Sequence, residues 1–68
     1  MQENKITINF KIKEYIDNHG ITQKFLVDKT GITPEKMSNI MNGKRKVTGE
    51  ELLKIADALK VNANIFLV

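Results

Sequence analysis

Residues 21–46 read ITQKFLVDKTGITPEKMSNIMNGKRK and contain the signals for two short helices separated by a sharp turn. Thr33 can accept a hydrogen bond from a free amide at a helix start, and Pro34 suits the first helical position. Gly31 and Gly43 follow the two helical segments, where a left-handed residue often ends a helix. Two short helices joined by a turn that contains glycine predict a helix-turn-helix.

Helices are also expected on both sides of this stretch, because apolar residues recur there every three or four positions. These positions are Ile8, Ile12 and Ile16 upstream, and Leu52, Ile55, Ala56 and Leu59 downstream. Thr48 and Glu51 fit a capping box at the start of the downstream helix, and Asn62 can cap a last short turn. Thr22 can cap the helix that precedes the glycine turn. The sequence therefore predicts an all-α fold, a compact bundle of five short helices.

The chain has 68 residues, no cysteine, and a longest apolar run that extends only from Ile65 to Val68. This length suits one domain, so we expect residues 1–5 to be a flexible N-terminus and residues 6–68 to be the folded domain. The lack of cysteine excludes disulfides, and the apolar run is far too short to span a membrane. The N-terminal residues lack the apolar segment of a secretion signal. These features predict a soluble, cytoplasmic protein.

Positive charge is concentrated in the first two-thirds of the chain. Up to Val47 there are nine Lys and Arg residues against five Asp and Glu residues, whereas from Thr48 onward there are two against three. The whole chain has a net charge of +3 and a pI of about 9.3. This distribution suits a polyanionic partner that is bound through the first two-thirds of the sequence.

The helix that follows the glycine turn is predicted to have an apolar and a polar face. Met37, Ile40 and Met41 share the apolar face, which we expect to enter the core. The outward face carries Glu35, Lys36, Ser38, Asn39 and Asn42. Such side chains can read base edges when a helix enters the major groove of DNA, and the basic residues that follow can bind phosphates.

In these features the chain resembles the phage Cro/repressor-type helix-turn-helix domain, also called XRE-like or lambda-repressor-like, from roughly Ile8 to Leu67. The resemblance implies base-reading positions at Thr33, Pro34, Glu35 and Asn39. It implies phosphate contacts by Gln23, Asn42, Lys44, Arg45 and Lys46. From the expected outward face and helix start we add Ser38 to the base-reading set, and Thr22 and Lys36 to the phosphate-binding set. Glu35 can instead be only a partner of the helix dipole, and Ser38 can contact a phosphate or simply be exposed.

Three features depart from the pattern of this family. Val27 stands where the family often has alanine. Ile16 and Met41 stand where it often has an ion pair, and because apolar packing can replace such a pair, we expect these two side chains to touch. Pro34 stands where many members have a long polar side chain, so one base contact is expected to be missing or replaced by apolar contact with a thymine methyl group.

An enzyme is not expected from this sequence. His19 and Ser38 are the single histidine and the single serine, and they lie on different predicted helices, so a catalytic triad would need a coincidence of packing. A metal site would have one imidazole and no thiolate, and we expect His19 to be a surface or helix-end residue. No cofactor and no small-molecule ligand is expected, because no sensing segment follows Val68.

The sequence thus predicts a regulator that binds specific double-stranded DNA, most simply a repressor, with the helix after the turn in the major groove. One short helix reads only a few base pairs, so we expect a homodimer, at least on DNA, that binds a pseudo-palindromic operator. The candidate dimer contacts are Ile65, Leu67 and Val68. The alternative is an antitoxin-like module that neutralises a partner protein through this apolar C-terminus and binds DNA only secondarily.

Overall fold

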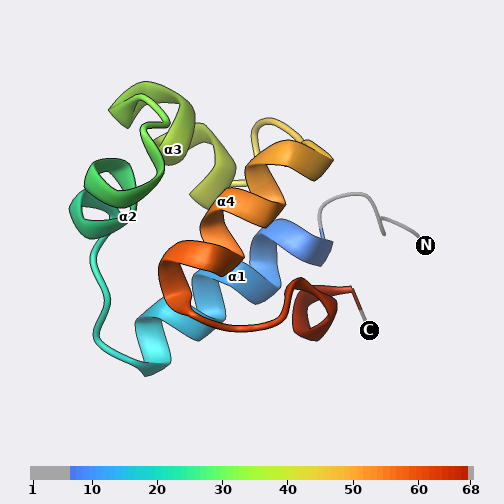
Figure 1. Cartoon of the computed structure of the whole chain (residues 1–68). Coiled ribbons are helices and arrows are strands. Elements are labelled where there is room, and N and C mark those ends of the chain that lie inside the picture. The colour runs from blue at the N-terminus through green and yellow to red at the C-terminus, as the bar shows by residue number, and fades with distance from the viewer. Residues whose placement is uncertain (1–6, 68) are drawn as a thin grey trace.

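The computed structural model describes residues 7–67, which form four α-helices and one 3-10 helix (Figure 1). The elements are α1 (Thr7–Asn18), α2 (Gln23–Thr30), α3 (Pro34–Met41), α4 (Gly49–Leu59) and the 3-10 helix η2 (Ala63–Phe66). The predicted all-α fold is confirmed, although the last of the five predicted helices is a single 3-10 turn, a form that proteins use in short pieces. The predictions for residues 1–5 and for Val68 lie outside the described residues. Within residues 7–67, no helix is long and apolar enough to cross a membrane.

Threonine side chains cap the starts of α2, α3 and α4. The hydroxyls of Thr22 and Thr33 each accept a hydrogen bond from the amide three residues along the chain, at 3.1 and 3.2 Å. At α4 the capping box is complete, since Thr48 and Glu51 each bond the other's backbone amide at 3.1 Å. These bonds satisfy amides that have no partner inside a helix, and they fix where such short helices begin.

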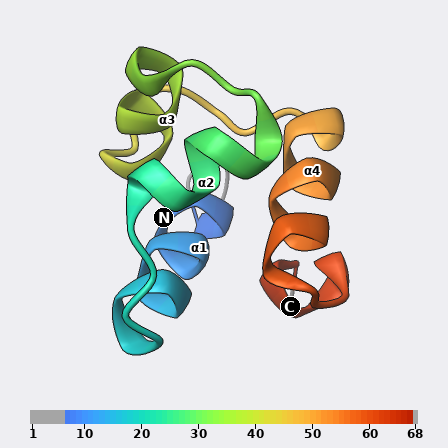
Figure 2. The same cartoon turned by 60° about the vertical axis from the view of Figure 1, so that its left-hand side comes forward.

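The core is formed by residues from all five elements and from the turn between α2 and α3. α2 packs against both α3 and α4 and lies between them in the view of Figure 2. α1 packs against α3 and η2. The buried apolar residues are Ile12, Ile16, Leu26, Ile32, Met37, Ile40, Met41, Leu52, Ile55, Ala56 and Phe66. This set includes the whole predicted apolar face of α3. It also includes both Ile16 and Met41, as the replacement of an ion pair by apolar packing requires.

α4 ends at a residue type that is unusual for the backbone conformation found there. Lys60 caps this helix with a φ of 61°, in the left-handed region that favours glycine. Its amide donates to the carbonyl of Asp57 at 3.1 Å, which serves the last turn of the helix. Gly31 ends α2 in the same region with a φ of 79°, and there the sequence does predict the cap.

Candidate nucleic-acid interface

α3 buries its apolar face and exposes its first turn. Thr33, Pro34, Glu35 and Lys36 are exposed, and Ser38 and Asn39 are half-buried. The Ser38 hydroxyl accepts a long hydrogen bond, 3.4 Å, from the side chain of Asn42. All five predicted base-reading residues are therefore accessible to solvent, and the three at the start of the helix are the most exposed.

The start of α2 lies beside the start of α3. Gln23, Lys24, Val27 and Asp28 of α2 and Pro34 of α3 together line one surface hollow of about 430 Å³. Thr22 and Gln23 are exposed at the N-terminus of α2, where unpaired backbone amides and the helix dipole favour an anion. The two helix starts thus present one continuous surface, with potential anion contacts on α2 and polar side chains on α3.

The basic loop, residues 42–48, connects α3 to α4. Its exposed residues include Asn42, Lys44 and Lys46. The amide of Lys44 donates to the carbonyl of Asn39 at 2.8 Å, which ties the loop to the last turn of α3. Within residues 7–67, no ion pair involves Lys44 or Lys46, so both ammonium groups are accessible to an external anion.

Arg45 differs from its two lysine neighbours. It is half-buried, and its Nη1 lies 2.9 Å from Glu51 Oε2 in the first turn of α4. Burial raises the pKa of the Glu51 carboxyl, but hydrogen bonds from Thr48 and Arg45 and the charge of Arg45 outweigh it, so the pKa lies below its ordinary value. Any phosphate contact by Arg45 must therefore share the guanidinium with the Glu51 carboxylate.

Asn9 of α1 is a site residue that the sequence-based prediction missed. It is the one polar side chain buried among the described residues, and its Nδ2 donates to the carbonyls of Ile40 at 2.8 Å and Arg45 at 2.7 Å. One amide thus joins α1 to the end of α3 and to the basic loop. Its spacing from Ile12 and Ile16 on the apolar face of α1 is the signal that could have identified it.

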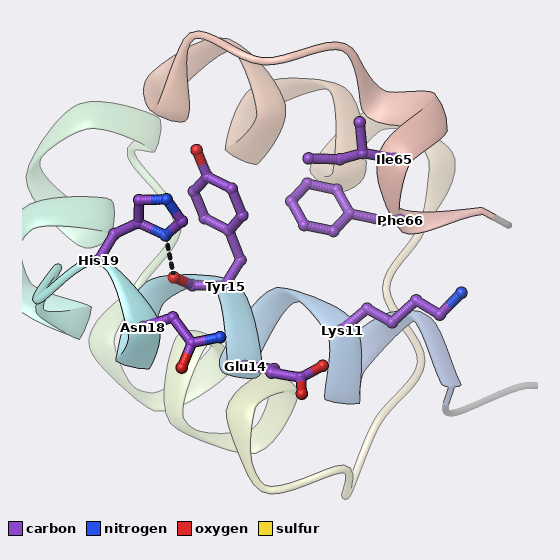
Figure 3. Close-up of a pocket in the computed structure, with 7 residues that line it drawn as sticks. All are labelled: Lys11, Glu14, Tyr15, Asn18, His19, Ile65 and Phe66. Atoms are coloured by element: carbon purple, nitrogen blue, oxygen red, sulfur yellow. Dashed lines mark hydrogen bonds between the residues drawn. The ribbon is translucent and has the colours of Figure 1, made fainter.

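A second hollow, of about 260 Å³, lies between α1 and η2 (Figure 3). Its lining includes Tyr15 and His19, whose rings stack with centroids 4.0 Å apart. His19 is exposed and its Nδ1 lies 2.8 Å from the carbonyl oxygen of Tyr15, so it is the surface residue at a helix end that the sequence predicts. In the part of the chain that the structure describes, no cluster of three or more His, Cys, Asp or Glu residues could hold a metal ion.

The C-terminal turn exposes apolar side chains. Ile65 is 43% exposed and Leu67 is 54% exposed, whereas Phe66 between them is buried. Phe66 meets Tyr15 edge to face with ring centroids 5.8 Å apart, which anchors the turn on α1. Two of the three predicted dimer contacts are therefore available on the surface.

Comparison with known proteins relates these features to one family. A family model described as a Cro/C1-type HTH DNA-binding domain matches residues 11–63. The match covers most of the chain, from the second turn of α1 to the first residue of η2. Neither the curated proteins nor the solved structures provide a match.

Proposed function

Since the chain belongs to the Cro/C1-type helix-turn-helix family of DNA-binding domains, we propose that it is a sequence-specific transcriptional regulator, most simply a repressor, whose α3 enters the major groove. The observation that carries this proposal is the shared hollow of Gln23 and Pro34, which sets the exposed starts of α2 and α3 side by side. A major groove admits one α-helix. α3 can enter it with its exposed first turn while α2 crosses the backbone.

Base reading falls to the accessible face of α3. Asn39 can bond an adenine edge through both its donor and its acceptor, and Glu35 can accept a hydrogen bond from cytosine. Pro34 donates nothing and instead contacts a thymine methyl group. Thr33 and Ser38 complete the set with hydroxyls that bond either donors or acceptors. The exposure of this face supports these roles.

Phosphate binding falls to the residues on either side of α3. Thr22 and Gln23 hold one phosphate at the N-terminus of α2, and Lys36, Asn42, Lys44 and Lys46 hold others. Arg45 contributes less than the lysines, because its guanidinium also pairs with Glu51 at 2.9 Å. These contacts position the domain and carry no sequence information.

Two copies of the domain bind a pseudo-palindrome, with half-sites about 34 Å apart. The exposed side chains of Ile65 and Leu67 support the C-terminal turn as the contact between the copies. The same exposure supports the second candidate function, an antitoxin-like module that docks a partner protein through this turn. Loss of these two exposed side chains would abolish cooperative DNA binding in the first case and partner binding in the second.

Selection of bound duplexes from a random DNA pool, followed by footprinting, tests the proposal. We expect an enriched motif with two-fold symmetry, protected on one face of the duplex. Replacing the exposed Ile65 and Leu67 by serine, with the buried Phe66 left in place, is expected to reduce cooperativity between half-sites and to leave half-site preference unchanged. A pool that shows no enrichment overturns sequence-specific binding, and a single short asymmetric footprint overturns the dimer.

A further inference from the structure

The amide of Asn9 is oriented by its two hydrogen-bond partners. Both partners, the carbonyls of Ile40 and Arg45, can only accept hydrogen bonds, so the side chain must present Nδ2 to them and not Oδ1. A hydroxyl has only one hydrogen to donate, and a carboxylate has none. The position therefore requires a small side chain with two donor hydrogens, which asparagine supplies.

The bond from Asn9 is one of three hydrogen bonds that attach the basic loop to three different helices. The amide of Lys44 binds the end of α3 at Asn39, the carbonyl of Arg45 binds α1 through Asn9, and the guanidinium of Arg45 binds α4 through Glu51. These bonds are 2.8, 2.7 and 2.9 Å long, and the bond to Asn9 is the one made by a side chain only 1% exposed. The loop is thus attached to all three helices that surround it.

We propose that Asn9 is a positioning residue that holds the basic loop in its phosphate-binding conformation before DNA arrives. The inference rests on the proposed function, and it adds a residue on α1 that touches no DNA. A loop that is already ordered has no ordering cost on binding, whereas ordering one flexible residue lowers affinity by about tenfold. Asn9 carries no charge, so its substitution leaves the number of phosphate contacts in the bound complex unchanged.

The test compares Asn9→Leu, which keeps the shape and removes both donors, with Asn9→Ser, which keeps one donor. Ile12→Val is the matched control, because it alters a buried side chain about one helical turn away and removes no hydrogen bond to the loop. Affinities for the selected site and a scrambled site are measured at several salt concentrations, well below each melting temperature. We expect Asn9→Leu to bind both DNAs about tenfold more weakly, with an unchanged log–log salt slope, and Asn9→Ser to be intermediate.

Equal affinities of Asn9→Leu and Ile12→Val overturn the inference while the proposed function stands. A wild-type protein that binds neither DNA overturns the proposed function and the inference together. Hydrogen exchange on the wild type needs no variant and covers the case in which the substitutions unfold the domain. We expect the Lys44 amide to be as protected in the free protein as on DNA, and protection that appears only on DNA overturns the inference.

Discussion

Arg45 and Glu51 form a 2.9 Å ion pair, and each of the two residues accepts one further hydrogen bond. The carbonyl of Arg45 accepts a hydrogen bond from Asn9, and the carboxylate of Glu51 accepts one from the amide of Thr48. The pair therefore couples the basic loop to the cap of α4. A change in either side chain is expected to affect both the folding of α4 and the geometry of the loop.

Glu51→Gln separates the ion pair from the cap, because glutamine can still accept the hydrogen bond from Thr48. We expect a loss of about 1 kcal/mol in the free energy of unfolding at pH 7. The folded-state pKa of Glu51 is lowered, so its stabilisation is present above 4.5, the ordinary pKa, and is lost as the pH falls through the lower folded value. Urea unfolding from pH 7 to pH 2.5 should show that the difference in free energy of unfolding between wild type and Glu51→Gln becomes smaller in acid. A difference that stays constant across this pH range contradicts the stabilising role of the ionised Glu51 carboxylate.

Local signals made the helix starts predictable, but the coupling between Arg45 and Glu51 was not. The capping box needs only the spacing of Thr48 and Glu51, which is fixed by one helical turn. The ion pair instead depends on the path of the basic loop, which the position of Asn9 helps to set. The sequence pattern placed Arg45 among the free phosphate ligands, because it could not show that the fold brings the Glu51 carboxylate of α4 next to the Arg45 guanidinium.

The end of α4 was unpredictable for a different reason. Glycine is the usual residue at a left-handed helix cap, and this helix has Lys60 there. Lys60→Gly should raise the free energy of unfolding by about 1 kcal/mol, because glycine adopts a φ of 61° without crowding at Cβ. Lys60→Ala is the control, since it removes the same charged chain and retains Cβ. Thermal unfolding should rank glycine above both wild type and alanine. An alanine variant as stable as the glycine variant would show that side-chain removal, and not backbone strain, is responsible.

Ile16 and Met41 both lie in the core, and their direct contact is still a prediction. Met41→Glu should lower the free energy of unfolding by roughly 3 kcal/mol, because it buries an unpaired charge. Adding Ile16→Arg should recover part of this stability if the two positions touch. Chemical denaturation of both single variants and the double variant gives the coupling energy directly. Simple additivity would place the two side chains out of contact.

Asn39 is predicted to read a base and not a phosphate. Asn39→Ala should relax the preference at one base position in each half-site, at a cost of about 1–3 kcal/mol in discrimination. The salt dependence of binding should remain nearly the same, because asparagine releases no counterion. Titration of the variant against a site panel with single base changes measures both effects. An equal drop in affinity for the selected and scrambled sites would assign Asn39 to the backbone.

Lys44 and Lys46 should behave in the opposite way, because their exposed ammonium groups are free of ion pairs within residues 7–67. Replacing either lysine by alanine removes one phosphate-binding charge, so the log–log salt slope should become shallower by about 0.9, with all sequences weakened alike. Lys13→Ala removes the same charge from a residue of α1 that pairs with Asp17 at 2.9 Å and is outside the predicted phosphate-binding set, so it should leave the slope nearly unchanged. Arg45→Ala should reduce protein stability and affinity together while changing the slope less than the lysines do, since its guanidinium is engaged by Glu51. Salt titrations of the four variants separate these effects, and a slope for Arg45→Ala that changes as much as for the lysines would make Arg45 a full phosphate ligand.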